Sequence, residues 1–158
     1  MIRGIAAPLL AALLAVSGNA AVSASGAKAP NKIYSRDCSV CHQNNGVGVP
    51  GAFPRLAGRV AALAALAPGR KVVIATVLYG MAGKLEADGH AIIGVMPGFP
   101  QFKDAEVAQV LNFLTSLNGN VTQKFTAKEV AAIRSMGPLT PTQVNTMARD
   151  SVLEVAQK

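Results

Sequence analysis

Several residue types are scarce in this sequence. It has no tryptophan, two histidines and two cysteines, and only 4% of its residues are aromatic. Two cysteines allow one disulfide at most, which excludes a fold held together by several disulfides. Acidic residues are also few: 8 stand against 15 lysines and arginines, so the formal net charge is +7. Such a protein is attracted to acidic surfaces, whether a partner protein or an anionic membrane, while its scattered basic residues argue against nucleic-acid binding.

The first 24 residues have the pattern of an export signal. Arg3 gives a positive start, residues 5–16 form an apolar run, and Ala20 and Ala24 are candidate cleavage positions. The run is shorter than the roughly 20 residues of a membrane-spanning helix, which favours a cleaved signal over an uncleaved anchor. We therefore predict a signal peptide over residues 1–24 and a periplasmic protein, whose net charge falls from +7 to +6 when Arg3 is removed.

The strongest chemical signal is Cys38-Ser39-Val40-Cys41-His42, a C-x-x-C-H motif. On a helix the two cysteines share one face, so both sulfurs can reach the vinyl groups on one edge of a porphyrin. His42 follows directly and can bind the iron as the proximal ligand. The motif therefore predicts covalent haem attachment through Cys38 and Cys41. The alternative is a Cys38–Cys41 disulfide in a thioredoxin-like site, which would need a βαβ context, whereas the surrounding pattern is helical.

Helical patterns flank the motif and recur later in the chain. Asn31 is a suitable N-cap for a first helix that runs into Cys38. The clearest helix opens at Asp104, where apolar residues follow i, i+3, i+4 and i+7 spacing, and it ends at Asn118-Gly119. These two helices are the main predicted elements.

The stretch between them is less regular. Glycines and prolines predict a loop over residues 43–58. Two helical segments are predicted after it, over residues 59–66 and 70–79. Asp88-Gly89 is a turn signal, and both a small hairpin and a twelve-residue loop over residues 81–92 fit the pattern. Met96 follows on a predicted loop over residues 94–100, held between glycine and proline.

Residues 120–158 form a predicted C-terminal helical extension. Thr126 and Glu129 make one capping box, and Thr140 and Gln143 make a second. A mostly apolar stripe follows on the last helix: Val144, Met147, Ser151, Val152 and Val155. This stripe either docks a larger redox subunit or packs on the chain's own core, and the sequence does not distinguish the two.

Together these features resemble a class I c-type cytochrome of the small periplasmic kind. The resemblance rests on the C-x-x-C-H motif at the end of a helix, on Phe53-Pro-Arg-Leu-Ala-Gly58 and Gly94-Val-Met96-Pro97, and on the long helix that follows. It covers residues 31–118. It implies an all-α, cytochrome c-like fold around one covalently bound haem c over residues 25–119, with the C-terminal helical extension added to it.

The resemblance also implies His42 and Met96 as the axial ligands of the iron. Thioether sulfur with imidazole nitrogen is an established haem pair. Met81 is a competitor, because it also lies beside glycine, but no proline follows it. His90 is a second competitor and would give a bis-histidine haem of lower potential.

The same resemblance predicts contacts between the first helix and the long helix, through Tyr34, Val110 and Phe113. Many members of the class place a tryptophan near a haem propionate, and this chain has none. Arg55 and Tyr79 are candidate replacements, although Arg55 is equally a candidate for an ordinary solvated loop residue.

Filled axial positions imply a one-electron carrier and not an enzyme. The expected partners are a periplasmic dehydrogenase as donor and a terminal oxidase or other cytochrome as acceptor, each with an acidic docking surface. The stretch that begins at Tyr79 resembles cytochrome subunits of periplasmic dehydrogenases, which allows a stable complex through the C-terminal helix. The alternative function is a haem enzyme or gas sensor with a labile Met96, although no distal His/Arg pair suited to peroxide chemistry is evident.

Overall fold

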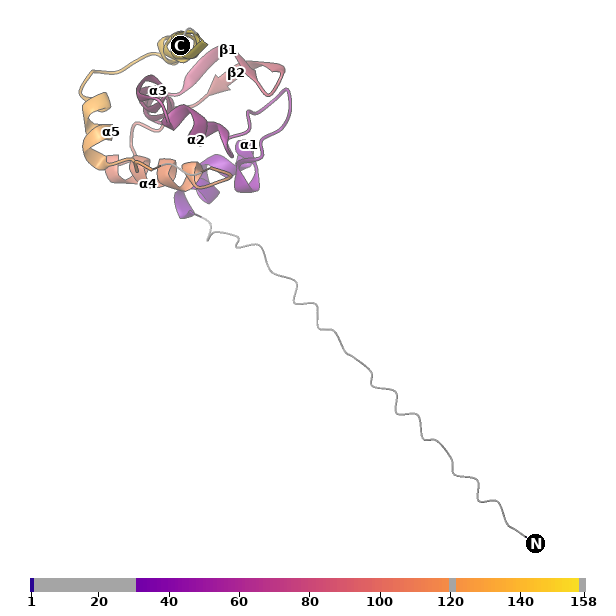
Figure 1. The fold of residues 1–158 in the computed structure, drawn as a ribbon. Helices are drawn as coiled ribbons and strands as arrows, with labels where there is room; N and C mark the ends of the chain where they lie inside the picture. Colours follow the sequence, from indigo (N-terminus) through magenta and orange to yellow (C-terminus); the bar gives the residue numbers. More distant parts are fainter. Residues whose placement is uncertain (2–30, 120–121, 157–158) are drawn as a thin grey trace.

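The computed structural model describes residue 1, residues 31–119 and residues 122–156, and the side chains of the last helix up to residue 151. The predicted signal peptide and the predicted start of the haem domain at residue 25 lie outside this part of the chain. The elements, in chain order, are η1 (Tyr34–Cys38), α1 (Ser39–His42), η2 (Asn44–Gly46), α2 (Arg59–Ala64), α3 (Ala67–Tyr79), β1 (Met81–Ala87), β2 (His90–Met96), α4 (Asp104–Thr115), α5 (Ala127–Arg134) and α6 (Pro141–Ala156) (Figure 1).

The first helical stretch begins where the sequence predicts. The side-chain oxygen of Asn31 accepts a hydrogen bond from the backbone N–H of Tyr34 at 3.0 Å, which satisfies a donor that the helix start leaves open. The stretch passes through the π-helical turn η1 into α1, so that Cys38, Cys41 and His42 follow one another on a continuous helical path. Tyr34 lies on Phe113 of α4 with 5.2 Å between the ring centroids, which confirms the predicted contact between the first and the long helix.

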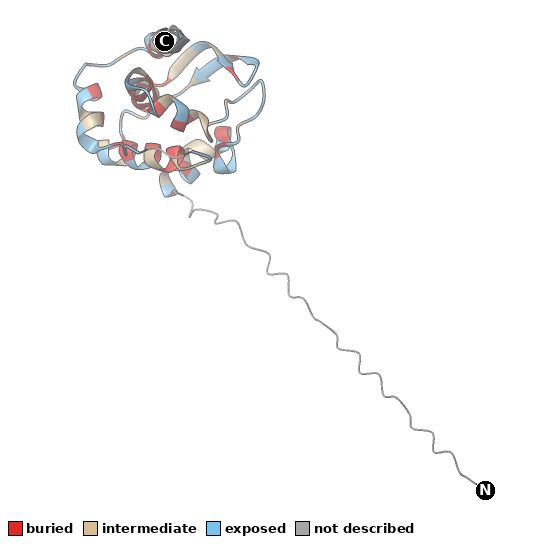
Figure 2. Ribbon diagram, viewed as in Figure 1, coloured by how far each residue is buried: buried red, intermediate tan, exposed pale blue. Residues whose placement is uncertain are grey.

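The hydrophobic core lies mainly between α3 and α4. The largest side chains on these helices that are buried to 1% exposure or less are Ile74, Leu78, Val107, Val110 and Leu111. Figure 2 shows buried residues along the sides of these helices that face the rest of the domain. Burial of apolar side chains of this size stabilises the fold by roughly 1.5–3 kcal/mol each.

Helix α3 begins three residues earlier than the predicted range of 70–79. Leu66 is extended and precedes the helix, and Pro68 lies in its first turn. Proline fits there because the first turn needs no N–H for an intrahelical bond. Pro68 and Gly69, which lie between the two predicted helical segments, therefore belong to the first turn of α3.

The predicted all-α fold is incomplete, because strands β1 and β2 pair as an antiparallel hairpin. Asp88 and Gly89 turn the chain with positive φ angles of 51° and 77°, which is the backbone that a two-residue hairpin turn requires. The hairpin alternative for residues 81–92 is thus the right one. The strand also extends further than predicted, since Met96 is the last residue of β2 and not part of a loop. The strand ends there because Pro97 has no N–H to continue the ladder.

Both predicted capping boxes lie at the starts of helices in the extension. The hydroxyl of Thr126 accepts from the N–H of Glu129 at 3.2 Å, and Thr140 and Gln143 bond reciprocally at 2.7 and 3.2 Å. In the first box the Glu129 side chain does not return to Thr126, because it is bound to Arg70 on α3.

The extension packs on the rest of the domain. Helix α5 lies against α3 and α4, and α6 lies against α3 and β1 (Figure 1). Four of its apolar side chains are buried: Phe125, Val130, Ile133 and Val144. The packing alternative is therefore correct for the first part of the apolar stripe, while the side chains of residues 152 and 155 lie outside the described part. Among the described residues, no helix has both the length and the apolar character needed to cross a membrane.

Candidate functional site

His42 closes helix α1 and is 6% exposed. Its ring atom Nδ1 lies 3.0 Å from the carbonyl oxygen of Pro54. A carbonyl only accepts, so Nδ1 carries the proton and Nε2 presents its lone pair. Burial lowers the pKa of His42 below its ordinary value, and the bond to Pro54 offsets part of that effect. The imidazole is therefore neutral at neutral pH, with one nitrogen oriented and the other ready to bind a metal.

The backbone around His42 is held by Tyr34. The phenol oxygen of Tyr34 donates to the carbonyl of Gln43 at 2.6 Å, and the N–H of Gly48 donates to the carbonyl of His42 at 2.9 Å. Gln43 has a φ of 60°, which turns the chain sharply after the histidine. Burial raises the pKa of Tyr34 to about 12, so this hydroxyl keeps its proton at neutral pH and remains a donor. These bonds fix where the helix ends and where the following loop begins.

Cys38 and Cys41 lie on the same helical stretch as His42, and both are half-buried free thiols. Cys38 packs against the hydrophobic core. Burial, with the nearby charges of Asp37 and Cys41, raises the pKa of the Cys38 thiol to about 11. The two sulfurs are not joined, and the surroundings are helical, so the arrangement does not match the disulfide alternative.

The segment that carries Met96 is pressed against the C-terminal end of α3. The N–H of Phe99 donates to the carbonyl of Val77 at 2.8 Å. A Cβ atom on Gly98 would lie 2.5–2.8 Å from backbone atoms at the end of α3, and one on Gly80 would meet the carbonyl of Met96. Only glycine permits this close approach. The end of α3 and the segment from Met96 to Phe99 are thereby held together, which restrains the backbone that carries Met96.

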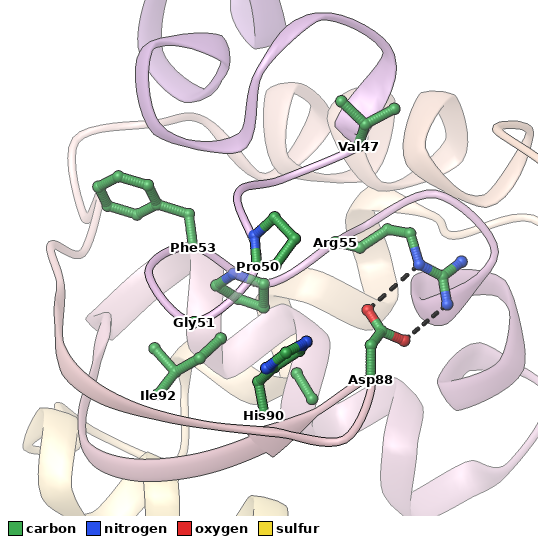
Figure 3. A pocket seen from close by; sticks show the side chains of 10 residues that line it. Val47, Pro50, Gly51, Phe53, Arg55, Asp88, His90 and Ile92 are labelled. Carbon is green, nitrogen blue, oxygen red and sulfur yellow. Dashed lines mark hydrogen bonds and ion pairs between the residues drawn. The ribbon is translucent and has the colours of Figure 1, made fainter.

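A hollow of about 280 Å³ lies between the loop that follows His42 and the tip of the hairpin. Figure 3 shows Pro50 and Phe53 from the loop on one side of it, with Ile92 and His90 from β2 on the other. Pro54, whose carbonyl orients His42, also lines it. The hollow is mostly apolar and adjoins the histidine loop.

Arg55 and Asp88 join the loop to the hairpin at the edge of this hollow. The guanidinium donates to both carboxylate oxygens at 3.2 and 2.7 Å, and to the carbonyl of Ala57 at 2.6 Å. The bond to Arg55 holds the pKa of Asp88 below its usual range. Tyr79, the other candidate replacement for tryptophan, donates to the carbonyl of Arg134 at 3.3 Å. Arg55 and Tyr79 thus both have hydrogen-bond acceptors within the chain.

The structure brings together three of the four predicted site residues, namely Cys38, Cys41 and His42, on one helical path. Met96 is supplied separately, by the end of β2. His90 is at the opposite end of that strand and lines the hollow. The sequence analysis missed the orienting role of Pro54, although the Phe53-Pro54 pair was already noticed as part of a motif.

These residues suit a haem. The donors are two unpaired thiols beside an imidazole with a free lone pair, and a thioether on a restrained segment, which match covalent attachment and axial ligation. Within residues 31–119 and 122–151, no group of three or more histidine, cysteine or carboxylate side chains could hold a metal ion. The two thiols, the imidazole and the thioether are the groups that attach and ligate a haem.

Known proteins support the same conclusion. The family described as Cytochrome c matches residues 27–118. Cytochrome c-552 of Thermus thermophilus is 44% identical over 140 residues, covering 85% of this chain and 90% of the relative. A second Thermus thermophilus cytochrome c-552 is 46% identical over 118 residues, covering 72% of this chain and 88% of the relative.

A more distant relative is the cytochrome c subunit of the quinone alcohol dehydrogenase of Gluconobacter oxydans. It is 31% identical over 109 residues, which is 67% of this chain and 22% of the relative. Cytochromes c are electron-transfer proteins that carry covalently bound haem c. The match of the family over most of the described domain, and the identity to both Thermus proteins, show that this chain belongs to the cytochrome c family as a class I c-type cytochrome.

Proposed function

We propose that this protein is a periplasmic one-electron carrier with a single haem c, attached through Cys38 and Cys41 and ligated by His42 and Met96. The observation that carries the proposal is the hydrogen bond from His42 Nδ1 to the carbonyl of Pro54, at 3.0 Å. It leaves Nε2 as the ligand atom of a buried, neutral imidazole. A carbonyl that accepts from the ring nitrogen opposite the ligand atom also fixes the ring and makes it a better donor to iron.

Haem supplies a metal whose oxidation state changes by one electron, and the residues around it keep that change simple. His42 and Met96 would both hold the iron, and with both ligands in place oxygen or another substrate would have no access to it. The buried Nδ1–H bond and the glycine contacts beside Met96 restrain both ligands. Restrained ligands move little when the charge changes, which favours fast electron transfer.

Charge guides the choice of partner. Without the proposed signal peptide the chain has a formal net charge of +6, which favours encounter with acidic proteins. We propose a periplasmic dehydrogenase as donor and a terminal oxidase or another cytochrome as acceptor. The likeness to a dehydrogenase cytochrome subunit supports the first choice. The signal peptide over residues 1–24, the haem domain over residues 25–119 and the extension over residues 120–158 complete the proposal.

The test is spectroscopy and kinetics on the exported, haem-loaded protein. We expect low-spin, six-coordinate spectra in both oxidation states, and an electron-transfer rate with an acidic partner that falls as salt screens the attraction over about 10 Å at 0.1 M. A high-spin ferrous form that binds carbon monoxide readily would contradict the carrier and support the alternative, a haem enzyme or gas sensor. Recovery of the protein with its partners from its own cells would identify the donor.

A further inference from the structure

Met81 lies directly opposite Met96 in the hairpin. The antiparallel register pairs these two residues at the open end of the ladder, as the first residue of β1 and the last residue of β2. Residues directly opposite each other in an antiparallel pair project to the same face of the sheet, with Cβ atoms about 5 Å apart. The two thioethers therefore start from neighbouring points on one face.

That face is the inward one. Ala87 and Ile92 belong to it by the same alternation and are buried at 4% and 7% exposure. On the opposite face, Ile93 and Val95 are 80% and 76% exposed. Both methionines are half-buried, and Met81 packs against the hydrophobic core. Met81 is thus held beside Met96 and on the protein side of the hairpin.

Among the described residues, no other sulfur-containing side chain is paired with Met96 in the hairpin. His90 lies on the same face, but it is six residues from Met96, which is roughly 20 Å along a strand. Methionine has a long unbranched side chain whose sulfur can occupy a range of positions from a fixed backbone. Met81 has the same sulfur chemistry as Met96 and the nearest starting point.

We propose that Met81 is a second thioether ligand, which binds the haem iron when Met96 is removed. The inference rests on the proposed ligation by His42 and Met96. It assigns to Met81 a role beyond packing: the hairpin offers the iron two methionines, and either one completes a six-coordinate His/Met haem.

Four haem-loaded proteins test the inference: wild type, Met81→Leu, Met96→Ala, and the double variant. Leucine preserves most of the volume of Met81 while removing its sulfur, and alanine at position 96 leaves room for a neighbouring side chain. The readouts are the thioether-to-iron charge-transfer band of the ferric protein and the reduction potential. Circular dichroism and the covalent haem content establish that each variant is folded and loaded.

The expected pattern is a retained charge-transfer band in wild type, Met81→Leu and Met96→Ala, with loss of the band and a lower potential only in the double variant. A matched Met96→Ala/His90→Gln variant should behave as Met96→Ala does. Loss of the charge-transfer band in the Met96→Ala single variant would overturn the inference and leave Met96 as the ligand. Loss in Met81→Leu but not in Met96→Ala would overturn the assignment of Met96 itself. A band that survives in the double variant would overturn both.

Discussion

Arg70 on α3 makes a group of polar contacts with residues 123–129, at the start of α5. Its guanidinium donates to both carboxylate oxygens of Glu129 at 2.7 Å, and to the carbonyls of Gln123 and Lys124 at 3.0 and 3.3 Å. It also lies 4.0 Å above the centre of the Phe125 ring. The arginine is 7% exposed, so these interactions are made largely out of water.

Replacing Arg70 by alanine should destabilise the protein by about 3 kcal/mol. Removal of one partner from a buried ion pair costs about 3–5 kcal/mol, because the other partner is left without compensation. The Glu129 side chain is 29% exposed and can regain some hydration, which places the expected value at the lower end. For a domain of this size that loss corresponds to a fall of about 10 °C in melting temperature.

Urea unfolding of the haem-loaded protein, followed by circular dichroism, measures this change. The matched control is Lys84→Ala, which removes one partner of an ion pair whose side chains are both 64% exposed. Exposed pairs contribute about 0–1 kcal/mol, so the control should be nearly silent. If Arg70→Ala costs no more than Lys84→Ala, the extension is not held by this buried pair.

Three further changes test other parts of the structure. Val144→Ala should lower the free energy of unfolding in urea by about 2 kcal/mol, because the side chain of Val144 is fully buried. In the control Val95→Ala the side chain is 76% exposed, and the loss should be less than about 0.5 kcal/mol. Equal losses in the two variants would contradict the packing of α6. Gly98→Ala should clash with the end of α3, costing about 2 kcal/mol or more and weakening the thioether charge-transfer band, and an unchanged band and stability would contradict the close approach. Asp88→Asn should lower stability at neutral pH relative to wild type. The bond to Arg55 lowers the pKa of Asp88 in the folded protein below the unfolded value of 3.8. The stability difference between wild type and Asp88→Asn should therefore disappear as the pH falls below 3.8 and through the folded pKa. A stability difference that persists at lower pH would contradict this role of the ion pair.

Local patterns were predicted well from the sequence. The N-cap at Asn31, the opening of α4 at Asp104, the N-cap at Thr126 and the capping box at Thr140 are where the residues indicate. Each depends on side chains within a few positions of one another, so a short stretch of sequence contains the whole cause. The turn at Asp88-Gly89 belongs to the same class, although a plain loop fitted the same residues.

Longer-range features were predicted less well. The placement of Met96 on a loop was wrong, because its strand exists only through pairing with β1. The role of the apolar stripe on α6 was open, because burial of Val144 depends on helices and strands distant in the chain. Glu129 looked like half of a capping box, and only the folded chain shows it bound to Arg70 instead.

The order of residues along the chain already specifies the chemistry of the site: two thiols and an imidazole at a fixed spacing, and the helices that carry them. Residues that are close in the sequence and on one helical stretch are brought together by the helix itself, without any contact from the rest of the fold. The orientation of the imidazole, the pairing of the two methionines and the surface that residues 122–151 cover emerge only when the chain folds. Those outcomes depend on contacts such as His42 with Pro54 and Met81 with Met96, in which hydrogen bonding and packing join segments that the sequence keeps apart.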